Sequence, residues 1–364
     1  MEGFINGIGI ISPQKTFGTD DFLSEVVEHN SKSLRCIEPS YKEFLNPVLA
    51  RRMARIIKMG IAASNVCFKD AKVEIPDAIM TGTALGCLED TEKFLLAIIE
   101  NDEQFLTPTS FIQSTHNTVS AQIALQLKCM NYNFTYVHKG FSFESAVLDG
   151  LMTLAEGEAK NVLVGGHDEM TDKYYRVCDR IGYFKEETVP TMELINSKTN
   201  GSIAGEGAAF FVLSNAKSES TYAKLRGIKT IYKPKSNQEI ESKITELLSS
   251  NGLTANDIDV VVYGINGDAR FDKTYYHLKD NFFKNSTATY FKHLCGEYQT
   301  AGSFAFWVAS KLIKTQSIPS AILIGDSRSR GFTSDGEQGL AIKNVLIYNT
   351  FLDSDHSVFL LSQC

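Results

Sequence analysis

The sequence predicts an α/β protein in which one succession of strands and helices is followed by a second of the same kind. The first succession is clearest in the middle of the chain, where a strand at residues 134–137 leads through Lys139 and Gly140 into a helix. Apolar residues recur every three to four positions along this helix, at about residues 142–156. A β-branched strand at residues 161–164 then follows and ends at two glycines. From Tyr222 onwards the same order begins again.

The residues before this motif alternate apolar runs with amphipathic stretches. Short apolar runs are typical of buried strands, and one-sided apolar spacing is typical of helices. The expected elements are a strand at 3–11, a helix and loop within 17–43, a helix at 49–70, a strand at 78–83, a helix at 88–101, an irregular segment at 105–114 and a small-residue helix at 118–127.

The residues after the motif complete the first succession and supply the second. Residues 172–200 are polar and predict a surface excursion, and residues 202–214 predict a buried strand. The polar residues 215–220 are the expected connection between two halves, residues 1–215 and 216–364. The second half is expected to hold strands at 222–232, 259–264, 321–325, 340–349 and 357–361, a helix at 236–251 that Gly252 ends, and a helix at 302–315.

Composition excludes several classes of function. A chain of 364 residues that is 43% apolar buries a large core, and its net charge of −7 disfavours nucleic acid as a partner. No apolar run reaches the length of a membrane span, and no signal peptide is expected, so the sequence predicts a cytoplasmic protein without membrane insertion. The seven cysteines are scattered and never spaced as C-x-x-C, which predicts reduced thiols, no metal site and no cofactor.

Five segments, in order, resemble the β-ketoacyl synthase (condensing enzyme) family. These segments are Gly7-x-Gly9 with Ser12-Pro13, Met59-Gly60-Ile61-Ala62-Ala63, Thr81-Gly82-Thr83-Ala84-Leu85-Gly86 with Glu92, the strand–turn–helix motif ending at Gly165-Gly166, and Gly205-Glu206-Gly207-Ala208 leading into a strand. The resemblance covers almost the whole chain. It implies a thiolase-like fold with duplicated β-α-β halves in a layered αβαβα arrangement.

The resemblance also implies that the family's catalytic residues are replaced here. Gly140 stands where the family has its cysteine, Tyr263 or Gly264 where it has its first histidine, and Glu297 where it has its second. Lys292 of the family's lysine motif is retained. Glycine cannot carry an acyl group, and an ionised glutamate only accepts hydrogen bonds, so we expect no condensing activity. Lys292 and Glu297 suggest an internal ion pair; the alternative is that Glu297 faces solvent.

A family member without its catalytic residues resembles a chain-length factor, the inactive subunit that pairs with an active ketosynthase in type II polyketide systems, including aryl polyene systems. The resemblance implies dimerisation through the strand at residues 133–137 and an acyl tunnel shared with the partner. Phe105, Phe111 and Ile112, and Phe351 in the C-terminal loop, are the expected tunnel residues. Docking of an acyl carrier protein is expected at the basic side of the helix at 49–70, which carries Arg51, Arg52, Arg55 and Lys58. A merely solvated basic face is the simpler interpretation.

Two other functions stay open. One is an acyltransferase or thioesterase with a rewired site, using Ser142 or a cysteine such as Cys87 or Cys295. The other is a homodimeric module that binds an acyl carrier protein without any ketosynthase partner. His167-Asp168-Glu169 predicts the loop at a strand end and not a metal site, because adjacent residues rarely converge on one ion.

Overall fold

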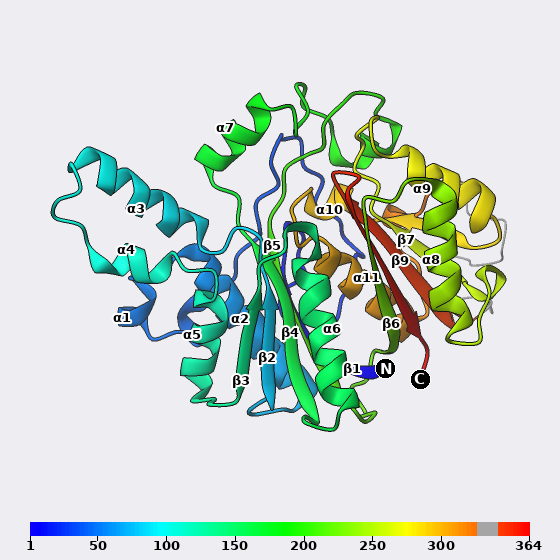
Figure 1. Ribbon diagram of the computed structural model, residues 1–364, viewed down its shortest axis with the longest axis horizontal. Coiled ribbons are helices and arrows are strands. Elements are labelled where there is room, and N and C mark those ends of the chain that lie inside the picture. The colour runs from blue at the N-terminus through cyan, green and yellow to red at the C-terminus, as the bar shows by residue number, and fades with distance from the viewer. Residues whose placement is uncertain (326–340) are drawn as a thin grey trace.

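The computed structural model describes residues 1–325 and 341–364 and shows five layers, helix–sheet–helix–sheet–helix (Figure 1). The strands of the first half are β1 (Gly3–Ile11), β2 (Ala78–Gly82), β3 (Tyr132–Tyr136), β4 (Asn161–Asp168) and β5 (Gly207–Ser214). Those of the second half are β6 (Ala223–Tyr232), β7 (Val260–Tyr263), β8 (Thr287–Tyr290), β9 (Asn344–Phe351) and β10 (Asp355–Ser362).

The two halves repeat one topology. The order β3-β2-β4-β5-β1 in the first half corresponds to β8-β7-β9-β10-β6 in the second. In both, the three strands farthest from the junction are parallel and the remaining pairings are antiparallel. The halves join where β1 and β6 pair at Gly3, Phe4 and Ile5. The duplicated, layered α/β arrangement expected from the sequence is therefore confirmed.

Helices fill the middle and outer layers. The middle layer holds α6 (Ser142–Ala155) and α11 (Gly302–Thr315), whose buried side chains pack with residues of both sheets in one shared core. One outer layer holds α2 (Arg55–Ala71) and α5 (Thr118–Leu127), and the other holds α8 (Asn237–Ser249), α9 (Lys273–His277) and the π-helical turn η5 (Leu278–Phe282). Because the central core draws on both halves, they fold against each other. The boundary at residue 215 stays a prediction.

The remaining helices are short or peripheral. They are η1 (Tyr41–Glu43), α1 (Pro47–Ala50), α3 (Leu88–Glu100), α4 (Pro108–Gln113), η2 (Lys139–Phe141), α7 (Asp172–Arg180), η3 (Thr191–Asn196), η4 (Ala255–Asp257), α10 (Lys292–Cys295) and η6 (Ser320–Ile322). The α3–α4 arm, comprising residues 88–113, projects from the side of the molecule near β3 and α5 (Figure 1). No helix among the described residues is long and apolar enough to cross a membrane.

Several element predictions were wrong. The helix expected at 49–70 is broken, because the chain turns at residues 51–53 and α2 begins at Arg55. The strand expected at 321–325 is the turn η6 with a single bridge at Leu323. Residues 17–43 contain only η1, whereas the segment expected to be irregular at 105–114 contains α4. Residue 340, in the strand expected at 340–349, lies outside the described residues.

Candidate functional site

Gly140 lies in the turn η2, at the buried N-terminal end of α6. Its N–H donates to Asp355 Oδ2 at 3.1 Å, so a carboxylate from β10 already occupies this backbone donor. A Cβ atom at Gly140 would lie 2.6 Å from the Cβ of Phe351 and 3.0 Å from the Cβ of Asp355. Contacts this short require backbone movement. The turn therefore has room for a hydrogen atom and not for a nucleophilic side chain.

Lys292 and Glu297 form the expected internal ion pair. The Lys292 ammonium donates to Glu297 Oε1 at 3.0 Å, to Oε2 at 2.7 Å and to the Thr350 carbonyl at 2.9 Å, so all three of its donors are used. Asn266 Nδ2 donates to Glu297 Oε2 at 2.6 Å. The Glu297 side chain is 7% exposed, which excludes the alternative that it faces solvent. The pair is a closed structural unit without a free donor for an oxyanion.

Tyr263 and Gly264, the two candidates for the first histidine position, point to opposite faces of the second sheet. The Tyr263 ring is buried in the outer cluster that lies under α8 and α9, and its hydroxyl has no hydrogen-bond partner in the part of the chain that the structure describes. A Cβ at Gly264 would instead lie 2.3 Å from Asn349 Oδ1 and 2.8 Å from the Tyr275 hydroxyl. Tyr263 therefore cannot replace the family's first histidine as a hydrogen-bond donor.

Side chains nearly fill the space beside Glu297 and Phe351. Phe351 and Glu297 line a cavity of about 20 Å³, together with nine other residues. A volume of this size accepts about one water molecule and no acyl chain. The structure brings Gly140, Lys292, Glu297 and Phe351 together around the ends of β9 and β10, and we call this set the Gly140 site.

Ser142, the candidate nucleophile of a rewired site, is hydrogen-bonded within the turn before α6. Its buried hydroxyl accepts from the His138 N–H at 2.8 Å and donates to the Lys139 carbonyl at 2.8 Å. Cys87 and Cys295 are also buried, and burial raises the pKa of both thiols. A thiolate, which is the reactive form, is therefore disfavoured at either position.

Glu144, which the sequence reasoning missed, is buried one turn into α6. Its Oε1 accepts from the Ser357 hydroxyl at 3.0 Å, while Oε2 has no hydrogen-bond partner among the described residues. Burial, with a smaller contribution from the neighbouring Asp355, raises the pKa of this carboxyl from 4.5 to about 8. The neutral acid is therefore the form that the folded protein holds at neutral pH.

We expect Glu144→Gln to stabilise the protein at high pH. A raised folded-state pKa means that the folded chain binds a proton that the unfolded chain has lost between about pH 4.5 and 8, so stability is present at low pH and falls as pH rises through the folded pKa. This group contributes a slope of up to about 1.4 kcal/mol per pH unit in that window, which glutamine abolishes. Urea unfolding at several pH values measures the slope, with the exposed Glu219→Gln as control. An unchanged slope would contradict the assignment.

Arg55, expected to contact a carrier protein, is engaged inside the protein. Its guanidinium donates to both oxygens of Glu206, at 2.7 Å to Oε2, and also to Glu38. The Glu206 side chain is fully buried within the Gly205-Glu206-Gly207 motif, so Arg55 neutralises a buried charge. Arg51 and Arg52 are exposed in the turn before α2, and Lys58 is partly buried on the helix. The four basic residues do not form one helix face, which corrects that expectation.

The expected tunnel residues of the α3–α4 arm are exposed in the single chain. Phe105 is 93% exposed and Phe111 is 56% exposed, and Ile112 beside it is also exposed. These side chains therefore do not fill a core of this chain. The edge strand β3 nearby also presents apolar side chains, at Tyr132 and Phe134. The exposed aromatic side chains of Tyr132 and Phe134 form an apolar face on this edge strand, which we call the β3 face.

Residues 28–245 match the family model described as "Beta-ketoacyl synthase, N-terminal domain". Since this match spans more than half of the chain, the chain belongs to the β-ketoacyl synthase family. No curated protein matches it by sequence.

Solved structures with the same fold include ketosynthases and chain-length factors. The ishigamide ketosynthase/chain length factor aligns with a TM-score of 0.80 at 18% identity, covering 100% of this chain and 99% of that one. A β-ketoacyl synthase from Burkholderia phymatum STM815 aligns with a TM-score of 0.79 at 16% sequence identity. The alignment covers 100% of this chain and 99% of that one. The structure of the ketosynthase ApeO in complex with its chain length factor ApeC, from Xenorhabdus doucetiae, aligns with a TM-score of 0.74 at 13% sequence identity. The alignment covers 100% of this chain and 98% of that one. The thiolase-like ketosynthase fold is thus confirmed.

Proposed function

We propose that this chain is a catalytically degenerate ketosynthase-like subunit, a chain-length factor. In this proposal it pairs with an active ketosynthase and shapes the acyl tunnel of a polyketide, aryl polyene or fatty-acid-type pathway, while an acyl carrier protein delivers the substrate. The observation that carries the proposal is a closed Gly140 site beside an uncovered apolar face. A closed site cannot hold an acyl chain, and an apolar edge strand is an aggregation hazard unless a partner covers it.

The competing functions have weaker support. A rewired acyltransferase or thioesterase needs a free nucleophile beside a base. The Ser142 hydroxyl is not free, because it donates one hydrogen bond and accepts another within the turn. A homodimeric module that binds a carrier protein needs the same β3 face. It differs from the chain-length factor only in the identity of the partner.

Co-expression with an active ketosynthase from the same genome tests the proposal. We expect a 1:1 complex in size-exclusion chromatography with light scattering, and condensing activity of the complex that requires the partner's nucleophile. A homodimer that ignores the ketosynthase and binds the acyl carrier protein would favour the homodimeric module. If the chain is a monomer both when it is expressed alone and when it is co-expressed with the ketosynthase, the chain-length factor and the homodimeric module are both excluded.

We expect neither the purified chain nor its Gly140→Cys variant to take up an acyl group. The wild type lacks a side chain at this position, and the variant places Cβ 2.6 Å from Phe351, an overpacking that costs about 1–3 kcal/mol of stability. Intact-mass spectrometry after incubation with an acyl thioester checks both proteins. The partner ketosynthase serves as the positive control, and a stable adduct on the wild-type chain would contradict the prediction.

We expect Phe111→Ala to lengthen the products of the complex, with Phe105→Ala as the second candidate. An aromatic ring that closes a tunnel excludes longer chains, since each additional buried methylene is worth only about 0.8 kcal/mol. Because the Phe111 ring is largely exposed in the single chain, the melting temperature of that chain should change little. Product analysis beside a thermal melt separates the effects. An intact complex with unchanged products would exclude Phe111 from the tunnel.

A further inference from the structure

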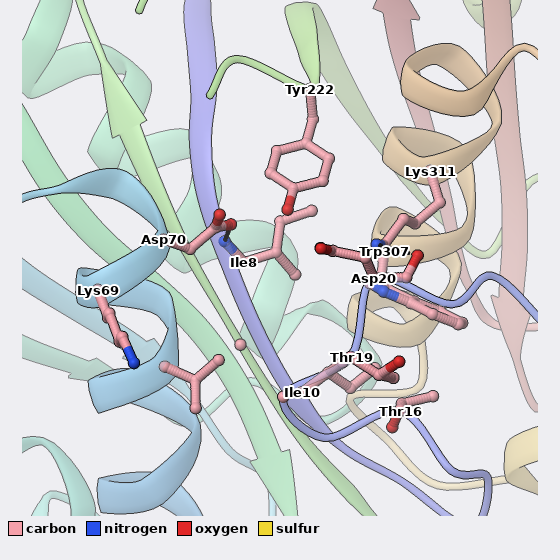
Figure 2. A pocket seen from close by; sticks show the side chains of 13 residues that line it. Ile8, Ile10, Thr16, Thr19, Asp20, Lys69, Asp70, Tyr222, Trp307 and Lys311 are labelled. Atoms are coloured by element: carbon pink, nitrogen blue, oxygen red, sulfur yellow. Dashed lines mark hydrogen bonds between the residues drawn. The ribbon is translucent and has the colours of Figure 1, made fainter. Parts of the chain in front are cut away.

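A hollow of about 390 Å³ lies between β1, α2, α11 and the segment of residues 16–20 (Figure 2). This volume falls within the usual range of small-molecule sites, about 300–1,000 Å³. The hollow is separate from the Gly140 site. Gly302, at the start of α11, lies beside Glu144, whereas Lys311 of the hollow lies nine residues further along the helix, or roughly 14 Å at 1.5 Å per residue.

Lys311 supplies a buried cation to this hollow. Its residue is 5% exposed, and among the described residues its ammonium donates only to the Asp20 carbonyl, at 3.2 Å, while lying 5.7 Å from the centroid of the Tyr222 ring. Among the described residues no carboxylate lies within ion-pair distance of it, about 4 Å. An ammonium has three donors, so two remain for a ligand. Burial also lowers the pKa of Lys311, which shows that the charge is held there at a cost.

Asp70 supplies an anion on the opposite side. It lies on α2, and its Oδ2 accepts from the Ile8 N–H at 2.9 Å, which holds the carboxylate against the unpaired edge of β1. The Tyr222 hydroxyl is a second hydrogen-bond partner of this carboxylate. A carboxylate has about four acceptor sites, so about half of its capacity is left. Figure 2 shows Asp70 and Lys311 entering from opposite helices, with Ile8 between them and Tyr222 above. The apolar part of the wall comes from Ile8, Ile10, Val66 and Trp307.

We propose that this hollow binds a free apolar α-amino acid. Its carboxylate accepts from Lys311, its ammonium donates to Asp70, and its side chain packs on Ile10 and Trp307. A simple carboxylic acid would leave Asp70 unpaired and close to a like charge, and a simple amine would do the same with Lys311. Only a ligand with both charges pairs both groups.

A set of matched probes tests the charge requirement on the wild-type protein. L-phenylalanine carries both charges, 3-phenylpropanoate lacks the ammonium, and 2-phenylethylamine lacks the carboxylate. Titration calorimetry, supported by ligand-observed NMR, should show L-phenylalanine binding at least tenfold more tightly than either analogue, since a charged hydrogen bond adds about this much. L-leucine should bind as well. The proposal is overturned if neither amino acid binds at millimolar concentration, or if an analogue binds equally well.

Two variants then test which protein residue binds the carboxylate of the ligand and which binds its ammonium group. Lys311→Met should weaken binding of L-phenylalanine at least tenfold, and Asp70→Asn should do the same. Lys314→Met is the matched control: Lys314 also lies over the Tyr222 ring, at 5.6 Å from its centroid, but it does not line the hollow. Equal losses in the control and in Lys311→Met would overturn the assignment. The probe comparison needs no variant and stands even if a variant fails to fold.

Discussion

Lys292→Met is expected to lower the free energy of unfolding by about 3–5 kcal/mol, because it leaves the Glu297 carboxylate buried and unpaired. The Thr350 carbonyl also loses its Lys292 donor, and among the described residues Asn266 remains as the only side-chain partner of Glu297. Guanidinium unfolding curves, analysed by linear extrapolation, give the difference.

A control and a rescue make this measurement specific. Lys93→Met removes the same charge from an exposed pair with Glu89, which lies 2.7 Å away, and should cost at most about 0.5 kcal/mol. The double variant Lys292→Met/Glu297→Leu should recover much of the loss, since a buried ion pair can often be replaced by apolar side chains. If Lys292→Met costs no more than Lys93→Met, the pair is not the closed buried unit described above.

The fold could be predicted from the sequence because its inner strands and helices carry strong local patterns. The strands β2, β4, β5 and β7 are apolar and bounded by glycine or polar residues, as a sheet covered on both faces requires. The edge strand β8, Thr287–Tyr290, was missed because it is four residues long and alternates with threonine. The start of α2 was misplaced since the apolar spacing continues through Met53, although the backbone turns there.

The site could be predicted only in part. The resemblance identified Gly140 and Glu297, but the residues that close the site come from β9 and β10, more than 200 positions after Gly140. A local sequence pattern cannot predict a contact between residues so far apart in the chain. The internal partner of Arg55 was missed for the same reason, since Glu206 lies 151 positions away. One signal was available: a glutamate between two glycines before a fully apolar strand needs a buried cation, and a basic residue near α2 was a candidate.

Phe134→Asp is expected to weaken the complex with the ketosynthase by at least a hundredfold, the effect of losing an interface hot spot of about 2–4 kcal/mol and burying a charge. Phe134 is the middle of three aromatic residues on the outer edge strand β3, with ring centroids 6.2 Å from Tyr132 and 4.9 Å from Tyr136. Within residues 1–325 and 341–364 the strand pairs with β2 alone, which leaves its other edge for a partner.

The substitution should leave the single chain folded. The Phe134 ring is about half exposed there, whereas Asn133 and Thr135 on the other face of β3 make the contacts to α5 through Ser120. Tyr232→Asp is the matched control, an exposed aromatic residue on β6, five strands away from β3 in the sheet order. Light scattering and a binding titration with the ketosynthase should show loss of the complex for Phe134→Asp only. A complex that survives this substitution with unchanged affinity would mean that the partner binds elsewhere, and the β3 face would then need another function.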